Sequence, residues 1–477
     1  MENKKTIVAI ELGSSKISGA AARRNEDGVL EVLAYASLPS SSFIHYGAVH
    51  NLDRTAEGIA KIQEMLQRKL NADITQLYFG CAGRSLRTVP VTLERTLEDG
   101  DVVSSDLVDE MLSECEEYPV DNMLPLCVAS QEFRTDHKAA AEQDPVGVSC
   151  SHLEGVFQKV MMRPKMWKLM DDSFSHASIR IADSMVTPLE LGKLILTDEE
   201  RQRGCALLDY GAETVTVSVY RSGQLAYLRV IPLGGEMITR DLMSQLQLSH
   251  DEAESLKVIY GLFGLSGSAE ETASVGDRRV PLKLVGEIVE ARNDEILANI
   301  AHQLKQSGCY DTLFGGIIVT GGGSNLKKLD VAMSNQFAGI SPIRFCKMVP
   351  SGVEWDETQD CTITDGTKLS LLALLASGDE NCCEFKEELV DMMAEPVPEN
   401  GQVFVTQDLF TDSGDSAQEE RDRKKEEERA VRRAAEEQEK ARRMQEENAA
   451  EETDKPKKPS IRQMVLTRFT KFFEEVQ

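Results

Sequence analysis

Three short apolar segments of the chain each lead into a turn rich in glycine or serine. They are TIVAIEL (6–12) before Gly13-Ser14-Ser15-Lys16, CALLD (205–209) before Tyr210-Gly211-Ala212-Glu213-Thr214, and GIIVT (316–320) before Gly321-Gly322-Gly323-Ser324. Such turns let backbone N–H groups approach an anion such as phosphate. Glu11 and Asp209 stand at the ends of the first two segments, where a carboxylate can hold a hydrated metal ion. One glycine turn alone is often only structural, but three in this order predict an anion site.

The segments around these turns predict the elements that position them. Each apolar segment has the length and composition of a buried strand. After the second turn, residues 215–220 and 224–231 alternate as strands around Arg221-Ser222-Gly223, which predicts a hairpin. The third turn instead opens a predicted helix over 325–337. The pattern therefore indicates an α/β protein with its turns at strand ends.

A second signal lies in the last eighteen residues, SIRQMVLTRFTKFFEEVQ (460–477). On a helix of about 100° per residue, the apolar side chains fall within about 120° of arc. This stripe consists of Ile461, Val465, Phe469, Phe472, Phe473 and Val476, with Leu466 at its edge, Arg468 and Lys471 on its flanks, and Arg462 inside it near the helix start. A face with three phenylalanines needs a partner. It docks on another protein, packs back on the body, or lies in a membrane interface.

The composition of the chain narrows the possible classes of protein and the possible partners of the tail. The chain has 477 residues, 41% of them hydrophobic, which suffices for two or more domains. A net charge of −27 argues against general nucleic-acid binding. Ten cysteines without a CxxC pair indicate a cytosolic protein with reduced thiols. The start of the chain lacks a signal-peptide pattern, and no apolar run approaches the roughly 20 residues of a membrane span. The longest such run, 369–376, predicts a buried helix.

A charged tether over residues 411–459 precedes the tail. From 419 to 452 it is almost entirely Glu, Lys, Arg, Gln and Ala, with acid–base pairs at i,i+4 and no apolar stripe. A solvated single helix and a disordered linker both fit this composition. Residues 455–473 hold six basic side chains and no acidic one, so this part alone is attracted to anionic lipid. A tether separates the tail from the body instead of packing the tail against it, so it favours a membrane as the partner of the tail.

These motifs resemble those of the actin, Hsp70 and sugar-kinase superfamily, and within it the FtsA family of bacterial cell-division proteins. The resemblance covers residues 4–377. Besides the three turns it includes Asp144-Pro145-Val146-Gly147 with Leu153-Glu154, and the segments LGGEMITRD (233–241), EAESLKVIYG (252–261) and IVEARNDEI (288–296). The tail after a charged linker is similar to the family's membrane-targeting sequence in position and character.

The resemblance implies an actin-like ATPase fold, with two lobes around a nucleotide cleft and a 1C subdomain in place of actin's 1B. It divides the chain into 1A (1–84 and 168–198), 1C (85–167), 2A (199–243 and 311–378), 2B (244–310), a linker (379–459) and a membrane-targeting helix (460–477). Residues 385–393 have the pattern of a short helix. No role is assigned to 379–410.

The resemblance also implies ATP and Mg²⁺ as cofactors. The residues that match the family's nucleotide-binding segments are Gly13, Ser14, Ser15 and Lys16 in the first phosphate loop, Asp209, Gly211 and Thr214 in the second, Gly234 and Gly235 in the turn that follows, Glu254 and Lys257 beside the adenine and ribose, and Gly321, Gly322, Gly323 and Ser324 in the adenosine loop. Glu11 and Asp209 match the positions that hold Mg²⁺ through water. No catalytic residue is identified.

Three residues depart from the family pattern. Glu11 replaces the more usual Asp, and Ala212 and Glu213 replace glycines. A carboxylate at Glu213 either repels phosphate, recruits further cation, or points to solvent. No histidine or carboxylate stands out as a general base for water. The resemblance therefore implies ATP binding with slow or absent hydrolysis.

The function implied is that of an adaptor at the cytoplasmic face of the inner membrane, at the division septum. It polymerises, binds the C-terminal peptide of FtsZ through 2B, contacts other division proteins through 1C, and binds anionic lipid through its tail, with no nucleic-acid partner. A type IV pilus assembly protein of the same fold and a small-molecule kinase are the alternatives. Neither needs the tether and tail.

Overall fold

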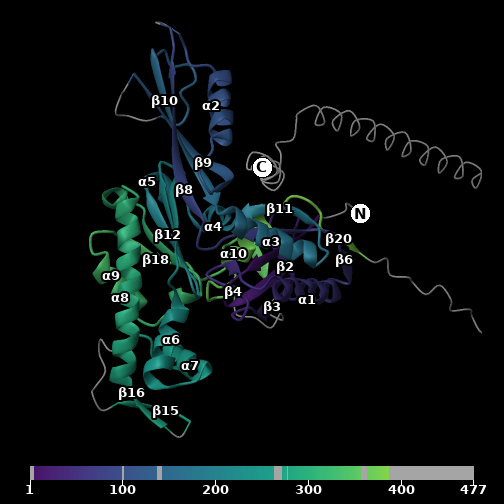
Figure 1. Ribbon diagram of the computed structural model, residues 1–477, viewed down its shortest axis with the longest axis vertical. Helices are drawn as coiled ribbons and strands as arrows, with labels where there is room; N and C mark the ends of the chain where they lie inside the picture. Colours follow the sequence, from purple (N-terminus) through teal and green to yellow (C-terminus); the bar gives the residue numbers. More distant parts are fainter. Residues whose placement is uncertain are drawn as a thin grey trace, which may run out of the picture. The chain divides into compact units, whose positions relative to one another are not determined.

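The computed structural model describes residues 5–98, 101–136, 142–262, 271–276, 278–355 and 363–385. The described part is built on two large sheets with helices between and outside them (Figure 1). We call the six-stranded one the first-lobe sheet and the eight-stranded one the second-lobe sheet. The predicted tether (411–459) and tail helix (460–477) lie outside the described residues.

The first-lobe sheet has the order β11-β7-β1-β2-β3-β19. Its strands are β1 (Thr6–Leu12), β2 (Lys16–Arg24), β3 (Leu30–Pro39), β7 (Leu77–Cys81), β11 (Ile181–Val186) and β19 (Val353–Trp355). β1, β2 and β3 form an antiparallel meander, and β7 and β11 continue it in parallel beside β1. Nearly every residue of β1 is buried, because helices cover both faces of the sheet.

Two pairs of helices cover the first-lobe sheet. On one face α1 (Leu52–Leu70) packs against β2, β3 and α3 (Pro164–His176). On the other, α10 (Leu369–Ser377) packs against β1, β2, β7 and α4 (Thr187–Ile195). The buried helix predicted from residues 369–376 is therefore confirmed, with almost all of α10 inaccessible to solvent.

The second-lobe sheet has the order β18-β17-β12-β13-β14-β8-β10-β9. Its strands are β8 (Arg87–Thr96), β9 (Leu124–Thr135), β10 (His152–Met162), β12 (Cys205–Tyr210), β13 (Val215–Arg221), β14 (Gln224–Ile231), β17 (Gly316–Thr320) and β18 (Ile343–Phe345). The predicted strands and the β13–β14 hairpin are confirmed. Ser222 and Gly223 form the hairpin turn with φ of 50° and 84°.

Alternate residues of the second-lobe sheet enter two different cores. Leu207 and Ile318 join the cluster that contains α10 and the first-lobe sheet. Their neighbours Leu208 and Val319 join a second cluster on the opposite face, together with α8 (Leu282–Gln306) and α9 (Leu329–Gln336). α4 and α10 are thus sandwiched between the two sheets, and this shared core joins the lobes.

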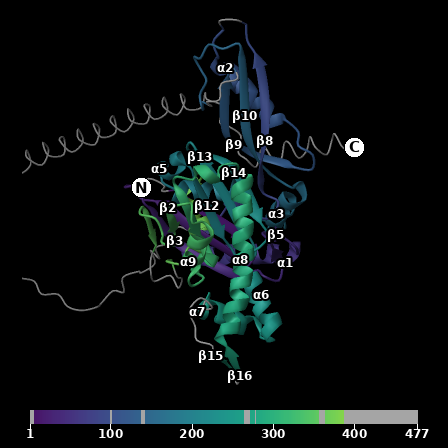
Figure 2. The same ribbon diagram turned by 90° about the vertical axis from the view of Figure 1, so that its left-hand side faces the viewer.

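α8 links the second-lobe sheet to a small subdomain (Figure 2). That subdomain holds α6 (Gly235–Leu246), α7 (His250–Tyr260) and the hairpin of β15 (Thr272–Val275) and β16 (Arg278–Pro281). It has its own apolar core, to which the first turns of α8 contribute. Its helices α6 and α7 carry residues that line the cavity described below.

A second small subdomain consists of β8, β9, β10 and α2 (Ser105–Glu117), with its own apolar core. These elements fall within the range predicted as 1C. β8 pairs with β14 at Arg87 and Arg229, so this subdomain extends the second-lobe sheet. The Leu228 amide also donates to the Thr88 hydroxyl at 2.9 Å.

The chain returns to the first lobe after α10. β20 (Cys383–Phe385) pairs with β6 (Ala72–Ile74), and the Tyr78 hydroxyl accepts hydrogen bonds from the amides of Asp379 and Glu380. Residues 379–385, the first part of the predicted linker, therefore lie on the folded body. Phe385 ends a strand rather than opening the predicted helix over 385–393, whose other residues lie outside the described ranges.

The remaining short elements complete the described chain. They are β4 (Ile44–His45), β5 (Ala48–Val49), α5 (Asp198–Arg203) and the 3₁₀ turns η2 (Tyr310–Thr312) and η3 (Gly322–Asn325). The helix predicted over 325–337 begins only at Leu329, because Lys328 takes a left-handed φ of 64° just before it.

Lys159 is a buried cation that fastens α2 to the sheet. Its side chain is fully inaccessible, and Nζ donates to the carbonyl oxygens of Cys115 (2.6 Å), Glu116 (3.2 Å) and Tyr118 (2.8 Å) at the end of α2. Helix C-termini leave such carbonyls short of partners. Lys159 supplies a donor to all three, and the Cys115 carbonyl also accepts from the Tyr118 amide at 3.1 Å.

We expect Lys159→Met to destabilise the fold by about 2–4 kcal/mol, because it removes three hydrogen bonds made by a buried ammonium group. Denaturant unfolding followed by circular dichroism measures this change. Lys165→Met, at an exposed lysine in α3, is the matched control and should shift stability by less than about 0.5 kcal/mol. Equal midpoints for the two variants would contradict the capping role of Lys159.

Candidate functional site

A cavity of about 470 Å³ lies where the two lobes meet. The turns after β1, β12 and β17 all open into it, so the structure brings together the three glycine turns found in the sequence. Of the residues predicted to bind nucleotide, the following line the cavity: Gly13, Ser14, Ser15, Lys16, Asp209, Gly211, Thr214, Gly235, Glu254, Lys257, Gly321, Gly322 and Gly323. Gly234 and Ser324 do not.

The first turn is closed by a hydrogen bond from the Gly13 amide to the Lys16 carbonyl, at 3.1 Å. A Cβ at Gly13 would lie 2.7 Å from that carbonyl oxygen, so only glycine fits. The Ser40 hydroxyl donates to the Gly13 carbonyl at 2.6 Å, and the Ser40 amide donates to Ser15. These bonds hold the turn rigid at the cavity wall.

The second turn repeats this geometry between β12 and β13. The Gly211 amide donates to the Thr214 carbonyl at 2.8 Å. Gly234 packs closely against this turn, and a Cβ there would lie only 2.5 Å from the Ala212 oxygen. The amides of Gly235 and Glu236, at the start of α6, donate to the carbonyls of Gly211 and Ala212. Gly234 is thus a packing residue of the site, and Gly235 reaches the cavity.

The third turn packs directly on the second. Gly321 has a φ of 83°, and a Cβ there would lie 2.4 Å from Asp209 Oδ1. A Cβ at Gly323 would lie 2.0 Å from the ring of Tyr210. Ser324 is a buried residue of η3, and its hydroxyl has no hydrogen-bond partner among the described residues. The close approach of these two turns brings β12 and β17 to one edge of the cavity.

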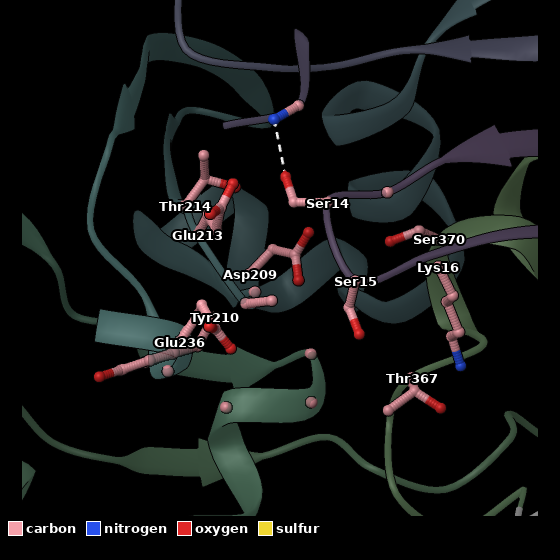
Figure 3. Close-up of a pocket in the computed structure, with 18 of the residues that line it drawn as sticks. Ser14, Ser15, Lys16, Asp209, Tyr210, Glu213, Thr214, Glu236, Thr367 and Ser370 are labelled. Atoms are coloured by element: carbon pink, nitrogen blue, oxygen red, sulfur yellow. Dashed lines mark hydrogen bonds between the residues drawn. The ribbon is translucent and has the colours of Figure 1, made fainter. Parts of the chain in front are cut away.

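Glu11 and Asp209 are two half-buried carboxyl groups at this edge. Figure 3 shows Asp209 between the first and second turns, with its carboxyl group directed into the cavity. Burial raises the pKa of Glu11 from 4.5 to about 7, and the charge of Asp209 adds to that rise while Lys16 opposes it. Burial likewise raises the pKa of Asp209 from 3.8 to about 6. Two neighbouring carboxyl groups of this kind gain most from a bound cation.

Glu254 and Lys257 form the wall contributed by α7. Lys257 Nζ lies 2.6 Å from Glu254 Oε2 and donates to the Thr239 hydroxyl at 2.9 Å and to the Gly235 carbonyl at 3.1 Å. The Thr239 hydroxyl in turn contacts Glu254 at 2.5 Å. This network fixes α7 against the start of α6, with its polar groups facing the cavity.

Glu213 does not point to solvent, so that reading of the sequence is wrong. Its side chain is only 3% exposed and lines the cavity between a guanidinium, an imidazole and a backbone amide. It pairs with Arg240, accepts the Tyr46 amide at 2.7 Å, and lies 3.6 Å from His45 Nδ1. Its charge is therefore matched by protein groups, which reduces the repulsion of an anion expected from the sequence.

Several cavity residues escaped the sequence analysis. They are Gly47, Gly80, Ala82, Gly83, Glu236, His250, Val258, Asn325, Gly366, Thr367 and Ser370. The run LYFGCAGR (77–84), an apolar strand followed by a glycine, carries the same signal as the three turns and would have identified Gly83. The others are brought in by tertiary packing.

The ten residues predicted to contact the membrane, between Ile461 and Val476, lie outside the described residues. Among the residues described, no helix has the length and apolar composition needed to cross a bilayer. In the same ranges, no group of three or more His, Cys, Asp or Glu side chains is arranged as a metal site.

Comparison with known proteins finds similarity to cell-division proteins. A family model described as cell division protein FtsA matches residues 206–350. The cell division protein FtsA of Porphyromonas gingivalis is 29% identical over 440 residues, which cover 89% of each chain. That of Pseudomonas aeruginosa is 26% identical over 336 residues, covering 69% of this chain and 80% of its own.

A solved structure shows the same fold. The chain aligns with one from the PilM–PilN type IV pilus biogenesis complex with a TM-score of 0.54 and 14% identity, covering 77% of this chain and 97% of that one. The expected actin-like α/β fold is confirmed. Over most of its length the chain is similar to cell-division proteins named FtsA, in agreement with the resemblance seen in its sequence.

Proposed function

We propose that this protein binds ATP with Mg²⁺ in the cavity between its lobes. The observation that carries the proposal is the convergence of three glycine turns and two half-buried carboxyl groups on one cavity. The turns after β1 and β12 offer backbone N–H groups and hydroxyls to phosphate oxygens. The turn after β17 and the Glu254–Lys257 wall are suited to the nucleoside part.

Magnesium fits the donors present. Glu11 and Asp209 are hard oxygen ligands, and a divalent cation offsets the cost of ionising both. Mg²⁺ keeps several waters and takes phosphate oxygens as further ligands, so two carboxylates held through water are sufficient. The bound ion neutralises phosphate charge.

We propose that hydrolysis is slow or absent, because the buried Glu213 is engaged by Arg240 rather than free as a base.

The biological role proposed follows from the family. The protein polymerises on the cytoplasmic face of the inner membrane at the septum and tethers the FtsZ ring there. The FtsZ C-terminal peptide binds 2B (244–310), later division proteins bind 1C (85–167), and anionic lipid binds the amphipathic tail (460–477). One such helix binds lipid weakly, so firm attachment comes from many helices on one polymer.

A role in type IV pilus assembly is the weaker alternative. It rests on the similarity to a chain of the PilM–PilN complex, which at 14% identity concerns the fold. The family model and the relatives named above are cell-division proteins. The small-molecule kinase alternative lacks an identified catalytic Asp beside a substrate pocket.

Asp209→Asn tests the nucleotide site. We expect it to weaken MgATP binding by about 10- to 100-fold, because it removes one of two carboxylates that hold the ion. Isothermal titration calorimetry with and without EDTA measures this loss. Asp198→Asn, at an exposed residue of α5, is the control. Equal affinities for wild type and Asp209→Asn would count against the site.

The raised carboxyl pKa values predict the pH dependence of stability without nucleotide or divalent cation. A raised pKa means that folding favours the protonated form. The stability contributed by Glu11 is present below its ordinary pKa of 4.5 and lost as pH rises through about 7. Between about pH 5 and pH 8, the free energy of unfolding of Glu11→Gln should therefore fall by about 2 kcal/mol less than that of wild type. Glu57→Gln, exposed on α1, should follow wild type, and a shared slope for all three would refute the prediction.

The tail is tested by co-sedimentation with anionic vesicles. Full-length protein should pellet with phosphatidylglycerol vesicles, and a truncation at Lys455 should stay in the supernatant. The double substitution of Phe469 and Phe472 by Glu should behave like the truncation, since it places charge on the apolar stripe. Pelleting that is unaffected by either change would rule out the tail as the anchor.

A further inference from the structure

A short hairpin of the first lobe reaches across the mouth of the cavity. β4 and β5 are joined by a two-residue turn, Tyr46–Gly47, with φ of 55° and 66°. Two left-handed residues in succession are the geometry of a type I′ turn. For Tyr46 this conformation is uncommon, so the surroundings must hold it. We call residues 44–49 the clasp hairpin.

The tip of the clasp hairpin rests on glycine backbone. A Cβ added to Gly47 would lie 2.6 Å from the Cα of Gly83, and one added to Gly83 would lie 2.4 Å from the Gly47 oxygen. Both glycines line the cavity, and Gly83 follows β7 of the same lobe. The tip is thus seated firmly on the first lobe.

Two successive amides at this tip bind the turns on opposite sides of the cavity. The Gly47 amide donates to the Ser14 hydroxyl at 2.8 Å, the bond drawn as a dashed line in Figure 3. The Tyr46 amide donates to Glu213 Oε2 at 2.7 Å. Ser14 belongs to the first-lobe turn and Glu213 to the second-lobe turn. The clasp hairpin therefore bridges the two turns proposed to hold phosphate.

Glu213 has further polar partners in this bridge. Its other oxygen accepts from Arg240 of α6, whose Nε lies 3.3 Å from Glu236, another residue of the cavity wall. His45, in the clasp hairpin itself, lies 3.6 Å from Glu213. A carboxylate that is only 3% exposed depends on such partners, because water cannot replace them while it stays buried. Opening the bridge therefore requires Glu213 and the hairpin to separate and become hydrated.

We propose that the Tyr46–Glu213 contact is a latch that controls nucleotide exchange. The inference rests on the proposed function, binding of ATP in this cavity. A nucleotide whose phosphates lie between the two turns can leave only when the turns part. The latch spans the same gap, so it must break first, and it slows entry and departure alike. Arg240 makes α6 part of the latch, which couples exchange to the position of that subdomain.

The experiment measures the dissociation of a fluorescent N-methylanthraniloyl-ATP with Mg²⁺ from the full-length protein, chased with excess ATP in a stopped-flow instrument. Glu213→Ala removes the acceptor of the Tyr46 amide, and Arg240→Gln leaves Glu213 without its guanidinium partner. The nucleotide should dissociate from both variants at least about 10-fold faster than from wild type. Association should accelerate as well, so the Kd changes less than the dissociation rate.

Glu132→Ala is the matched control. It breaks another Glu–Arg pair, with Arg221 at 2.7 Å, outside the cavity lining, and should exchange at the wild-type rate. Wild-type dissociation rates in both latch variants would overturn the latch and leave the proposal of ATP binding standing. A weaker affinity at an unchanged dissociation rate would also overturn the latch and not the binding. Absence of binding by the wild type would overturn both proposals. If Glu213→Ala does not fold, Arg240→Gln decides, since that side chain is 42% exposed.

Discussion

The cavity depends on one steric constraint, the close approach of three backbone turns that leaves no room for a Cβ. The turns after β12 and β17 touch through Gly321 and Gly323, and Gly234, in the turn after β14, packs on the turn after β12. Any side chain at these positions would force the strand ends apart. Asp209, at the end of β12, and the start of α6 both lie directly against these contacts.

The layered body explains why the cavity has walls of two kinds. α4 and α10 join the two sheets through a continuous apolar core, so the floor of the cavity is rigid. Toward the mouth the lobes meet through polar contacts instead, among them the buried charge of Glu213 and the amide of Tyr46. Because the lobes share an apolar core below the cavity and meet through polar contacts at its opening, relative motion of the lobes is confined to the opening.

Local patterns in the sequence were sufficient for the strands, the glycine turns and α10, because each is set by neighbouring residues. The three strands and the β13–β14 hairpin lie where predicted. The position of Glu213 was beyond such reasoning, since its partners Tyr46 and Arg240 are distant in sequence. The cavity residues Gly366, Thr367 and Ser370 were missed for the same reason. β20 was missed because its pairing with β6 joins segments some three hundred residues apart.

The return of the chain to β6 has a mechanical consequence. Beyond α10, the residues that lead toward the tail are fastened to the first lobe by the β20–β6 pair and by the Tyr78 hydroxyl. A pulling force applied to the C-terminal part of the chain is therefore delivered to the first lobe, through a short antiparallel pair at the edge of the body. Force arriving from the C-terminal side is therefore taken up by β6 and by Tyr78 of β7 before it reaches α10.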